Sequence, residues 1–166
     1  CLMTGQFTSR SGITHNGDPL PEDVLPLAQA LRGGGYQTCF VGKWHLGSEG
    51  DNSIPEGQRG GFEHFVGYQC YNGFDPNPPY NNDVFFYDEQ NVRHSYKKHR
   101  TEVTTDLAVE KLRLMCRENR PFFAVVGYQA PHYPEQPSPE YAALYEGVEF
   151  DKTPDYKEID PYTPTF

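Results

Sequence analysis

Two short runs of apolar residues set the strongest constraint on how this chain can fold. Residues 38–41 (TCFV) and 122–126 (FFAVV) are β-prone stretches that lack the alternation of polar and apolar side chains seen in half-exposed strands. Such runs are typical of central strands buried on both faces, and parallel strands need crossover helices to cover those faces. The sequence therefore predicts an α/β fold, a three-layer sandwich with a mostly parallel central sheet.

A helix is predicted before each of these two strands. Residues 26–32 carry a proline in the first turn and are followed by three glycines, which favours a short helix with a sharp end. Residues 106–118 place apolar side chains at helical spacing, and Thr105 stands where an N-cap residue is expected. The order of helix and then buried strand thus occurs twice.

The region between the two units predicts a hairpin. Residues 83–87 and 92–96 are β-prone segments on either side of the turn-prone residues 88–91. We expect them to form an antiparallel hairpin within a loop and hairpin excursion from the main sheet, over about residues 70–100.

The C-terminal part of the chain predicts one more short helix and a connector. Ser138 followed by a proline is expected to cap the helix, and Gly147 is expected to end it. We assign residues 1–150 to one domain and the Pro-rich residues 151–166 to an extension toward a further part of the polypeptide.

Charge and composition exclude several classes of protein. The 166 residues carry 14 Lys and Arg against 23 Asp and Glu, which gives a net charge of −9. This charge repels nucleic acids and anionic membranes, and no apolar run approaches the roughly 20 residues that cross a bilayer, so we expect neither partner. The four cysteines are far apart and lack metal-finger spacing, which indicates neither a zinc site nor a dense disulfide framework.

Polar residues that directly follow the two buried strands are the candidate site. Lys43 and His45 come after the first strand, and His132 follows the second in a loop flanked by prolines. If the backbone stays extended, Lys43 and His45 project to one side and Trp44 to the other. Because ligands bind at the carboxyl ends of strands in open α/β sheets, the three side chains are expected to converge. One lysine and two histidines with few acids suit a substrate bearing a phosphate-like or sulfate-like group.

The same residues have simpler interpretations. A lysine and a histidine at a strand end are often surface residues beside a packed tryptophan, and His132 could cap a turn or bond a carbonyl group. The basic residues 94–100 are interpreted as a solvated hairpin edge, with contact to a polyanionic substrate as the alternative.

Several motifs together resemble one enzyme family. Residues 35–38 (GYQT) and 42–47 (GKWHLG) are similar to the second signature of the formylglycine-dependent sulfatases, which have an alkaline-phosphatase-like fold. Residues 130–134 (APHYP) resemble the family's substrate-histidine segment, and residues 61–65 (GFEHF) resemble the stretch between the two. Residues 2–6 (LMTGQ) resemble the end of the first signature.

The resemblance implies a sulfuric ester hydrolase that cleaves sulfate esters of a carbohydrate or aryl substrate. It implies a hydrated formylglycine whose hydroxyl attacks sulfur and a calcium ion that neutralises sulfate oxygens. By the same resemblance, Lys43 would bind a sulfate oxygen and help hold the formylglycine hydrate. His45 would contact the formylglycine hydroxyl and take its proton, and His132 would assist departure of the alcohol.

Aligning the first signature with residues 2–6 puts the nucleophile a few residues before Cys1. Cys1 then falls on a variable position of the signature and is not the catalytic cysteine. The family's calcium ligands have no counterpart in this chain. We therefore expect an internal fragment of a sulfatase that is inactive alone. Its expected partners are the remaining sulfatase polypeptide, a formylglycine-generating enzyme and a sulfated small-molecule or glycan substrate.

The resemblance implies a periplasmic or extracellular site. A phosphonate or phosphate ester hydrolase of the same superfamily and a non-catalytic sulfated-glycan-binding remnant stay open as alternatives.

Overall fold

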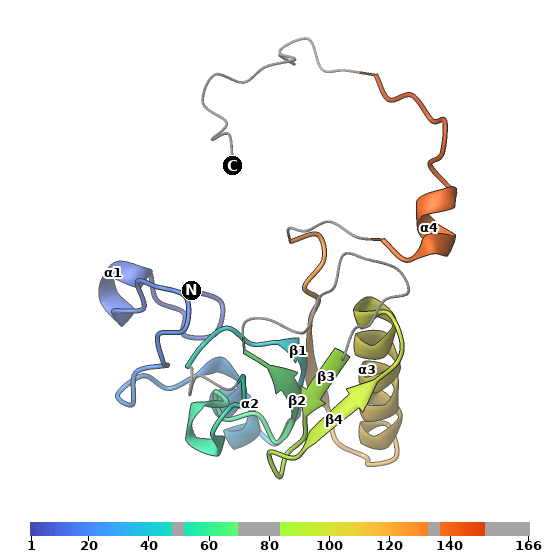
Figure 1. Ribbon diagram of the computed structural model, residues 1–166. Helices are drawn as coiled ribbons and strands as arrows, with labels where there is room; N and C mark the ends of the chain where they lie inside the picture. Colours follow the sequence, from blue (N-terminus) through green and yellow to red (C-terminus); the bar gives the residue numbers. More distant parts are fainter. Residues whose placement is uncertain (48–51, 70–83, 133–136, 152–166) are drawn as a thin grey trace. The chain divides into compact units, whose positions relative to one another are not determined.

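A computed structural model describes residues 1–47, 52–69, 84–132 and 137–151 (Figure 1). The chain divides into two compact units, residues 1–136 and 137–166. The helices are α1 (Thr8–Ser11), α2 (Leu27–Gly33), α3 (Arg100–Met115) and α4 (Pro139–Ala143), with one 3₁₀ turn at Glu56–Gln58. The strands are β1 (Gln37–Lys43), β2 (His64–Tyr68), β3 (Val84–Tyr87), β4 (Arg93–Tyr96) and β5 (Phe122–Gly127).

The five strands of the first unit form one open sheet in the order β4-β3-β2-β1-β5 (Figure 1). β1 lies between β2 and β5 and is parallel to both, while β3 is antiparallel to β2 and β4 is antiparallel to β3. Two of the four pairings are therefore parallel, and both involve β1. The carboxyl ends of β1, β2 and β5 lie at the same edge of the sheet.

Alternate side chains of β1 pack against helices on opposite faces of the sheet. Phe40 belongs to a buried cluster with Ala28 of α2, and Cys39 and Val41 belong to another with Ala108 and Met115 of α3. Since successive side chains of a strand point to opposite faces, α2 and α3 cover different faces. The predicted three-layer arrangement is confirmed, with α2 on one face of the sheet and α3 on the other.

The structure corrects two predictions about the strands. The hairpin forms as predicted, but β3 pairs with β2, so the hairpin extends the main sheet and is not an excursion from it. β5 is half-buried at one end of the described sheet, whereas its apolar composition predicted an interior strand. Residues 70–83 of the predicted excursion lie outside the described residues.

The structure also corrects two helix ends. α3 begins six residues before the predicted start, at Arg100, and His99 is its N-cap, accepting from the Thr101 N–H. Thr105 lies inside the helix, and its hydroxyl donates to the Thr101 carbonyl oxygen at 2.9 Å. α4 has Ser138 at the predicted cap position without a side-chain cap hydrogen bond, and it ends at Ala143, before Gly147.

Three glycines stand side by side where the parallel strands end. Gly42 of β1 is paired with Gly67 of β2 and Gly127 of β5. Gly42 has a φ of 125°, a backbone conformation that residues other than glycine rarely adopt. A Cβ atom at this position would collide with the Gly127 carbonyl oxygen. The backbones of β1 and β5 therefore approach closely just before the predicted site residues.

We expect Gly42→Ala to lower the free energy of unfolding by at least about 2 kcal/mol, because backbone strain and overpacking each cost on the order of 1–3 kcal/mol. Urea denaturation of the full-length protein measures the change. Gly33→Ala is the matched control, since a Cβ atom at Gly33 meets no atom within 4 Å. Equal stability of the two variants would show that β1 and β5 can separate at this point without cost.

Candidate functional site

Trp44 anchors the segment that carries Lys43 and His45. Its backbone N–H donates to the Tyr68 carbonyl oxygen at 2.9 Å, and its indole N–H donates to the Gln58 carbonyl oxygen at 2.9 Å. The ring is 5% exposed and packs edge-on against Phe40 and Phe65. Trp44 therefore faces the core, as predicted.

The backbone at His45 differs from the expected extended conformation. β1 ends at Lys43, and His45 has a φ of 61°, in the left-handed region. Two hydrogen bonds hold this turn against the N-terminal loop: Gly17 N–H donates to the His45 carbonyl oxygen at 3.4 Å, and Gly47 N–H donates to the Asp18 carbonyl oxygen at 3.0 Å. Side-chain direction at His45 is thus set by a turn and not by strand alternation.

His132 is exposed on the segment that follows β5. Its backbone N–H donates to the Gln129 carbonyl oxygen at 2.9 Å. The Gln129 side chain is buried, and its Oε1 accepts from the Tyr68 hydroxyl at 3.3 Å. Pro131 follows a cis peptide bond within this turn. The segment that carries His132 is therefore connected to the end of β2.

The electrostatics of His45 link the three predicted residues. Partial burial lowers the pKa of His45 below its ordinary value of 6.5, and the charges of Lys43 and His132 lower it further. The structure thus brings Lys43, His45 and His132 into one electrostatic neighbourhood. A lowered pKa favours a neutral imidazole near pH 7, and a neutral imidazole can accept a proton.

Tyr68 and Gln129 are functional candidates that the sequence analysis missed. Tyr68 ends β2 and is fully buried, and Gln129 is 7% exposed. A glutamine two residues after the end of β5 was a usable signal, because a buried amide needs hydrogen-bond partners. The Tyr68 partner was not predictable, since it comes from a strand 61 residues earlier.

The basic residues near β4 are paired with carboxylates of the same region. His94 Nε2 lies 2.8 Å from Asp88 Oδ2, and Lys98 Nζ lies 2.6 Å from Asp106 Oδ2. The His94 side chain is 50% exposed and that of Lys98 is 47% exposed. These pairs match the interpretation of a solvated hairpin edge.

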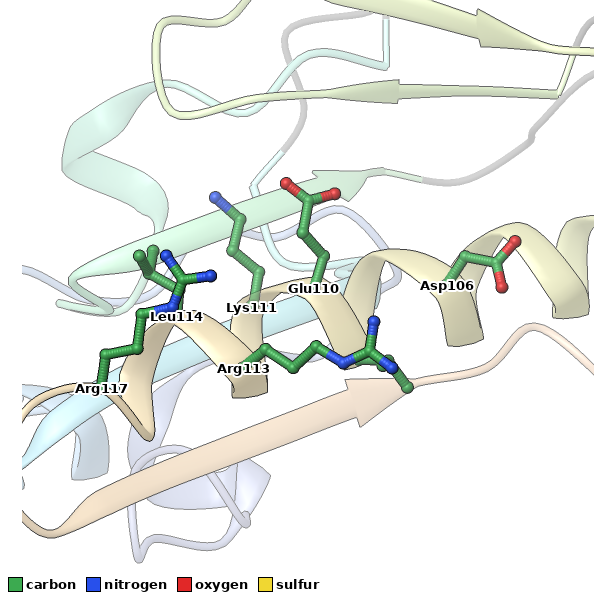
Figure 2. Close-up of a pocket in the computed structure, with 7 residues that line it drawn as sticks. Asp106, Glu110, Lys111, Arg113, Leu114 and Arg117 are labelled. Carbon is green, nitrogen blue, oxygen red and sulfur yellow. The ribbon is translucent and has the colours of Figure 1, made fainter.

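A separate hollow of about 640 Å³ lies along α3. The labelled residues in Figure 2 come from that helix, except Arg117, which lies in the turn just after it. Its lining contains none of the three predicted site residues; the residues are Asp106, Val109, Glu110, Lys111, Arg113, Leu114 and Arg117. The hollow is therefore not the predicted site.

The described residues do not provide a calcium site. Within residues 1–47, 52–69, 84–132 and 137–151, no group of three or more His, Cys, Asp or Glu side chains could hold a metal ion. Calcium takes about six to eight oxygen ligands, whereas the candidate site offers an ammonium group and two imidazoles.

A membrane-spanning helix must be both long and apolar. Among the described residues, every helix is too short or too polar to span a lipid bilayer.

Comparison with known proteins places the chain in a family. The family model "Sulfatase" matches residues 1–162. The chain is 30% identical over 146 residues to an ulvan-active sulfatase of Formosa agariphila, covering 87% of this chain and 27% of the relative. It is 29% identical over 150 residues to an N-acetylglucosamine-6-O-sulfatase of Bacteroides thetaiotaomicron, covering 90% and 24%. The chain spans about a quarter of the length of these curated relatives.

Solved structures agree with this result. One protein whose structure was solved in complex with its substrate D-glucosamine-2-N,6-O-disulfate is 26% identical in sequence to this chain. The two structures match with a TM-score of 0.69 over 95% of this chain and 30% of that chain. A putative sulfatase from Bacteroides fragilis has the same fold, with a TM-score of 0.73 at 21% identity, over 89% of this chain and 36% of that chain. Sequence motifs, sheet topology and these likenesses agree, and the chain belongs to the sulfatase family.

Proposed function

We propose that the protein containing this chain hydrolyses sulfate esters and that Lys43, His45 and His132 act directly on the ester. The observation that carries the proposal is the placement of the three residues: Lys43 ends β1, His45 lies two residues later, and His132 follows β5, which is parallel to β1. A cation and two imidazoles in one neighbourhood are suited to a tetrahedral anion. Membership of the sulfatase family supports a sulfate ester as that anion.

Lys43 supplies a permanent positive charge for the sulfate group. It ends β1, where it is paired with Tyr68 of β2, and the preceding Gly42 is paired on both sides, so its backbone has little freedom. A cation that is already in place when charge builds up on the transferring sulfate stabilises the transition state. We assign Lys43 to binding a sulfate oxygen.

His45 and His132 handle protons at different points of the reaction. His45, with its lowered pKa, is neutral near pH 7 and is suited to take a proton from a reacting hydroxyl. His132 is exposed on the segment after β5, where it can reach the bridging oxygen of a substrate that arrives from solvent. We assign His132 to protonating the departing alcohol.

The finer assignments are part of the same proposal. Relatives named for ulvan and for N-acetylglucosamine-6-O-sulfate favour a sulfated carbohydrate as substrate. A formylglycine would supply the attacking hydroxyl, and we propose that its precursor and the calcium ligands belong to parts of the polypeptide outside this chain. We propose that residues 1–150 belong to the catalytic domain, that 151–166 connect to its remainder, and that the protein follows a secretory route.

The test is a substrate comparison with the full-length protein, produced together with a formylglycine-generating enzyme. Sulfate esters of aryl alcohols and of sugars are assayed beside the matching phosphate and phosphonate esters. We expect turnover of the sulfate esters and its loss when both Lys43 and His45 are replaced with Ala.

Preferential turnover of phosphate or phosphonate esters would instead assign the protein to another branch of this chemistry. Binding of sulfated glycans without any turnover would indicate a non-catalytic binding protein. Full activity of the Lys43→Ala, His45→Ala double variant would refute the residue assignment.

A further inference from the structure

Tyr68 forms hydrogen bonds to both segments that carry the candidate site residues. Its carbonyl oxygen accepts from the Trp44 N–H at 2.9 Å, directly between Lys43 and His45. Its hydroxyl donates to Gln129 Oε1 at 3.3 Å, on the segment that leads to His132. A central strand residue thus connects the segment after β1 to the segment after β5.

The environment of Tyr68 keeps its hydroxyl in the donor state. The residue is fully buried, and its ring packs edge-on against Phe86 at a centroid distance of 5.1 Å. Burial raises the pKa of Tyr68 far above its ordinary value of 10, more than the nearby charge of Arg100 lowers it. The hydroxyl therefore stays protonated near neutral pH.

Gln129 connects the Tyr68 hydroxyl to the backbone of His132. Its side chain is 7% exposed, so Oε1 has little access to water, and a buried amide oxygen without a partner would be costly. The Gln129 carbonyl oxygen accepts from the His132 N–H at 2.9 Å. A change in the position of Gln129 therefore changes where the His132 backbone begins its turn.

We propose that Tyr68 is a positioning residue which, through Gln129, holds His132 in place relative to Lys43 and His45. The inference rests on the proposed function for its catalytic consequence. A phenylalanine would fill the same space against Phe86, so packing alone does not require the hydroxyl. The group that distinguishes tyrosine from phenylalanine here is the donor to Gln129.

The test compares Tyr68→Phe with Tyr96→Phe in the full-length protein. Tyr96 of β4 packs against the same Phe86, at a centroid distance of 6.0 Å, and is a matched control in the same cluster. We expect Tyr68→Phe to lower kcat for a sulfate ester about 3- to 10-fold, the usual value of one hydrogen bond, with KM little changed. Tyr96→Phe is expected to keep the wild-type kcat.

A double-mutant cycle separates positioning from packing. Gln129→Met keeps the side-chain volume but removes the acceptor, and it is expected to lower kcat at least as much as Tyr68→Phe. The variant with both changes should lose no more than Gln129→Met alone, because each removes the same interaction. Multiplied losses would indicate two independent effects and would contradict the pair.

The pKa of His45 provides a measurement that does not need activity. His132 is one of the charges that lower this pKa, together with Lys43 and partial burial. When His132 is held less firmly, that contribution weakens, so the pKa of His45 should rise toward 6.5 in Tyr68→Phe and stay unchanged in Tyr96→Phe. NMR titration of protein labelled with ¹³C at histidine Cε1 measures the pKa of His45 in the two variants. The His45→Gln variant assigns the His45 signal.

The kcat and the pKa of His45 together distinguish failure of the proposed function from failure of the positioning role. If the wild-type protein turns over no sulfate ester, the proposed function fails, and the His45 titration alone decides the positioning role. If the wild type is active, Tyr68→Phe with unchanged kcat overturns the inference. An unchanged pKa of His45 in Tyr68→Phe overturns it in either case.

Discussion

Replacing Lys43 with Ala is expected to lower kcat/KM for sulfate esters about 10²- to 10³-fold, the usual effect of removing one preorganised group that stabilises charge. Lys43 lies at the end of β1, and its charge contributes, after partial burial, to the lowered pKa of His45. Loss of the ammonium group leaves the charge on the transferring sulfate without this partner. Initial-rate kinetics on an aryl sulfate and on a sulfated sugar measure the change.

Two variants make this result specific. Lys98→Ala removes a lysine of the β4 region that is paired with Asp106 at 2.6 Å, and it is expected to keep kcat/KM within about twofold, because exposed ion pairs contribute little. Lys43→Arg keeps the charge but not the shape of the group, so it should recover only part of the activity. A Lys43→Ala enzyme as active as Lys98→Ala would exclude Lys43 from sulfate binding.

Replacing His132 with Ala is expected to lower kcat by about 10²- to 10⁴-fold for a sugar sulfate, which is the usual contribution of a positioned acid. The loss should be much smaller for a nitrophenyl sulfate, because its leaving group departs without a proton. The measurement is therefore kcat for a series of sulfate esters whose alcohols differ in pKa. A steeper dependence on that pKa in the variant is the expected signature of a missing acid.

His94→Ala is the control for this series. His94 is exposed on β4 and lies 2.8 Å from Asp88, apart from the segments after β1 and β5. We expect the wild-type dependence on leaving-group pKa in this variant. If His132→Ala shows an equal loss for all esters, His132 contributes to binding or structure and not to protonation of the alcohol.

The behaviour of His45 with pH has a definite sign. Its pKa is lower in the folded protein than the ordinary 6.5, so folding disfavours the protonated form. The stability contributed by neutral His45 is fully present above pH 6.5 and is lost as the pH falls through the folded-state value. The same shift extends the pH range in which His45 can act as a base toward lower pH.

Local sequence patterns were sufficient to predict the strands and helices that carry the site. The apolar runs of β1 and β5, the glycines after α2 and the turn between β3 and β4 are signals within a few neighbouring residues. Lys43, His45 and His132 were predicted to meet because parallel strands end at the same edge of a sheet. That argument needs only the identity of the two strands and the residues that follow them.

The sequence by itself determined the α/β class, the segments that carry the site and the chemistry of their side chains. The tertiary structure alone decided that the hairpin joins the sheet beside β2, that β5 lies at its end, that His45 turns out of the strand, and that Tyr68 bonds Gln129. These features depend on contacts between residues far apart in the chain, such as the hydrogen bond between Tyr68 and Gln129. Local propensity contains no information about which distant backbone or side chain will supply the partner.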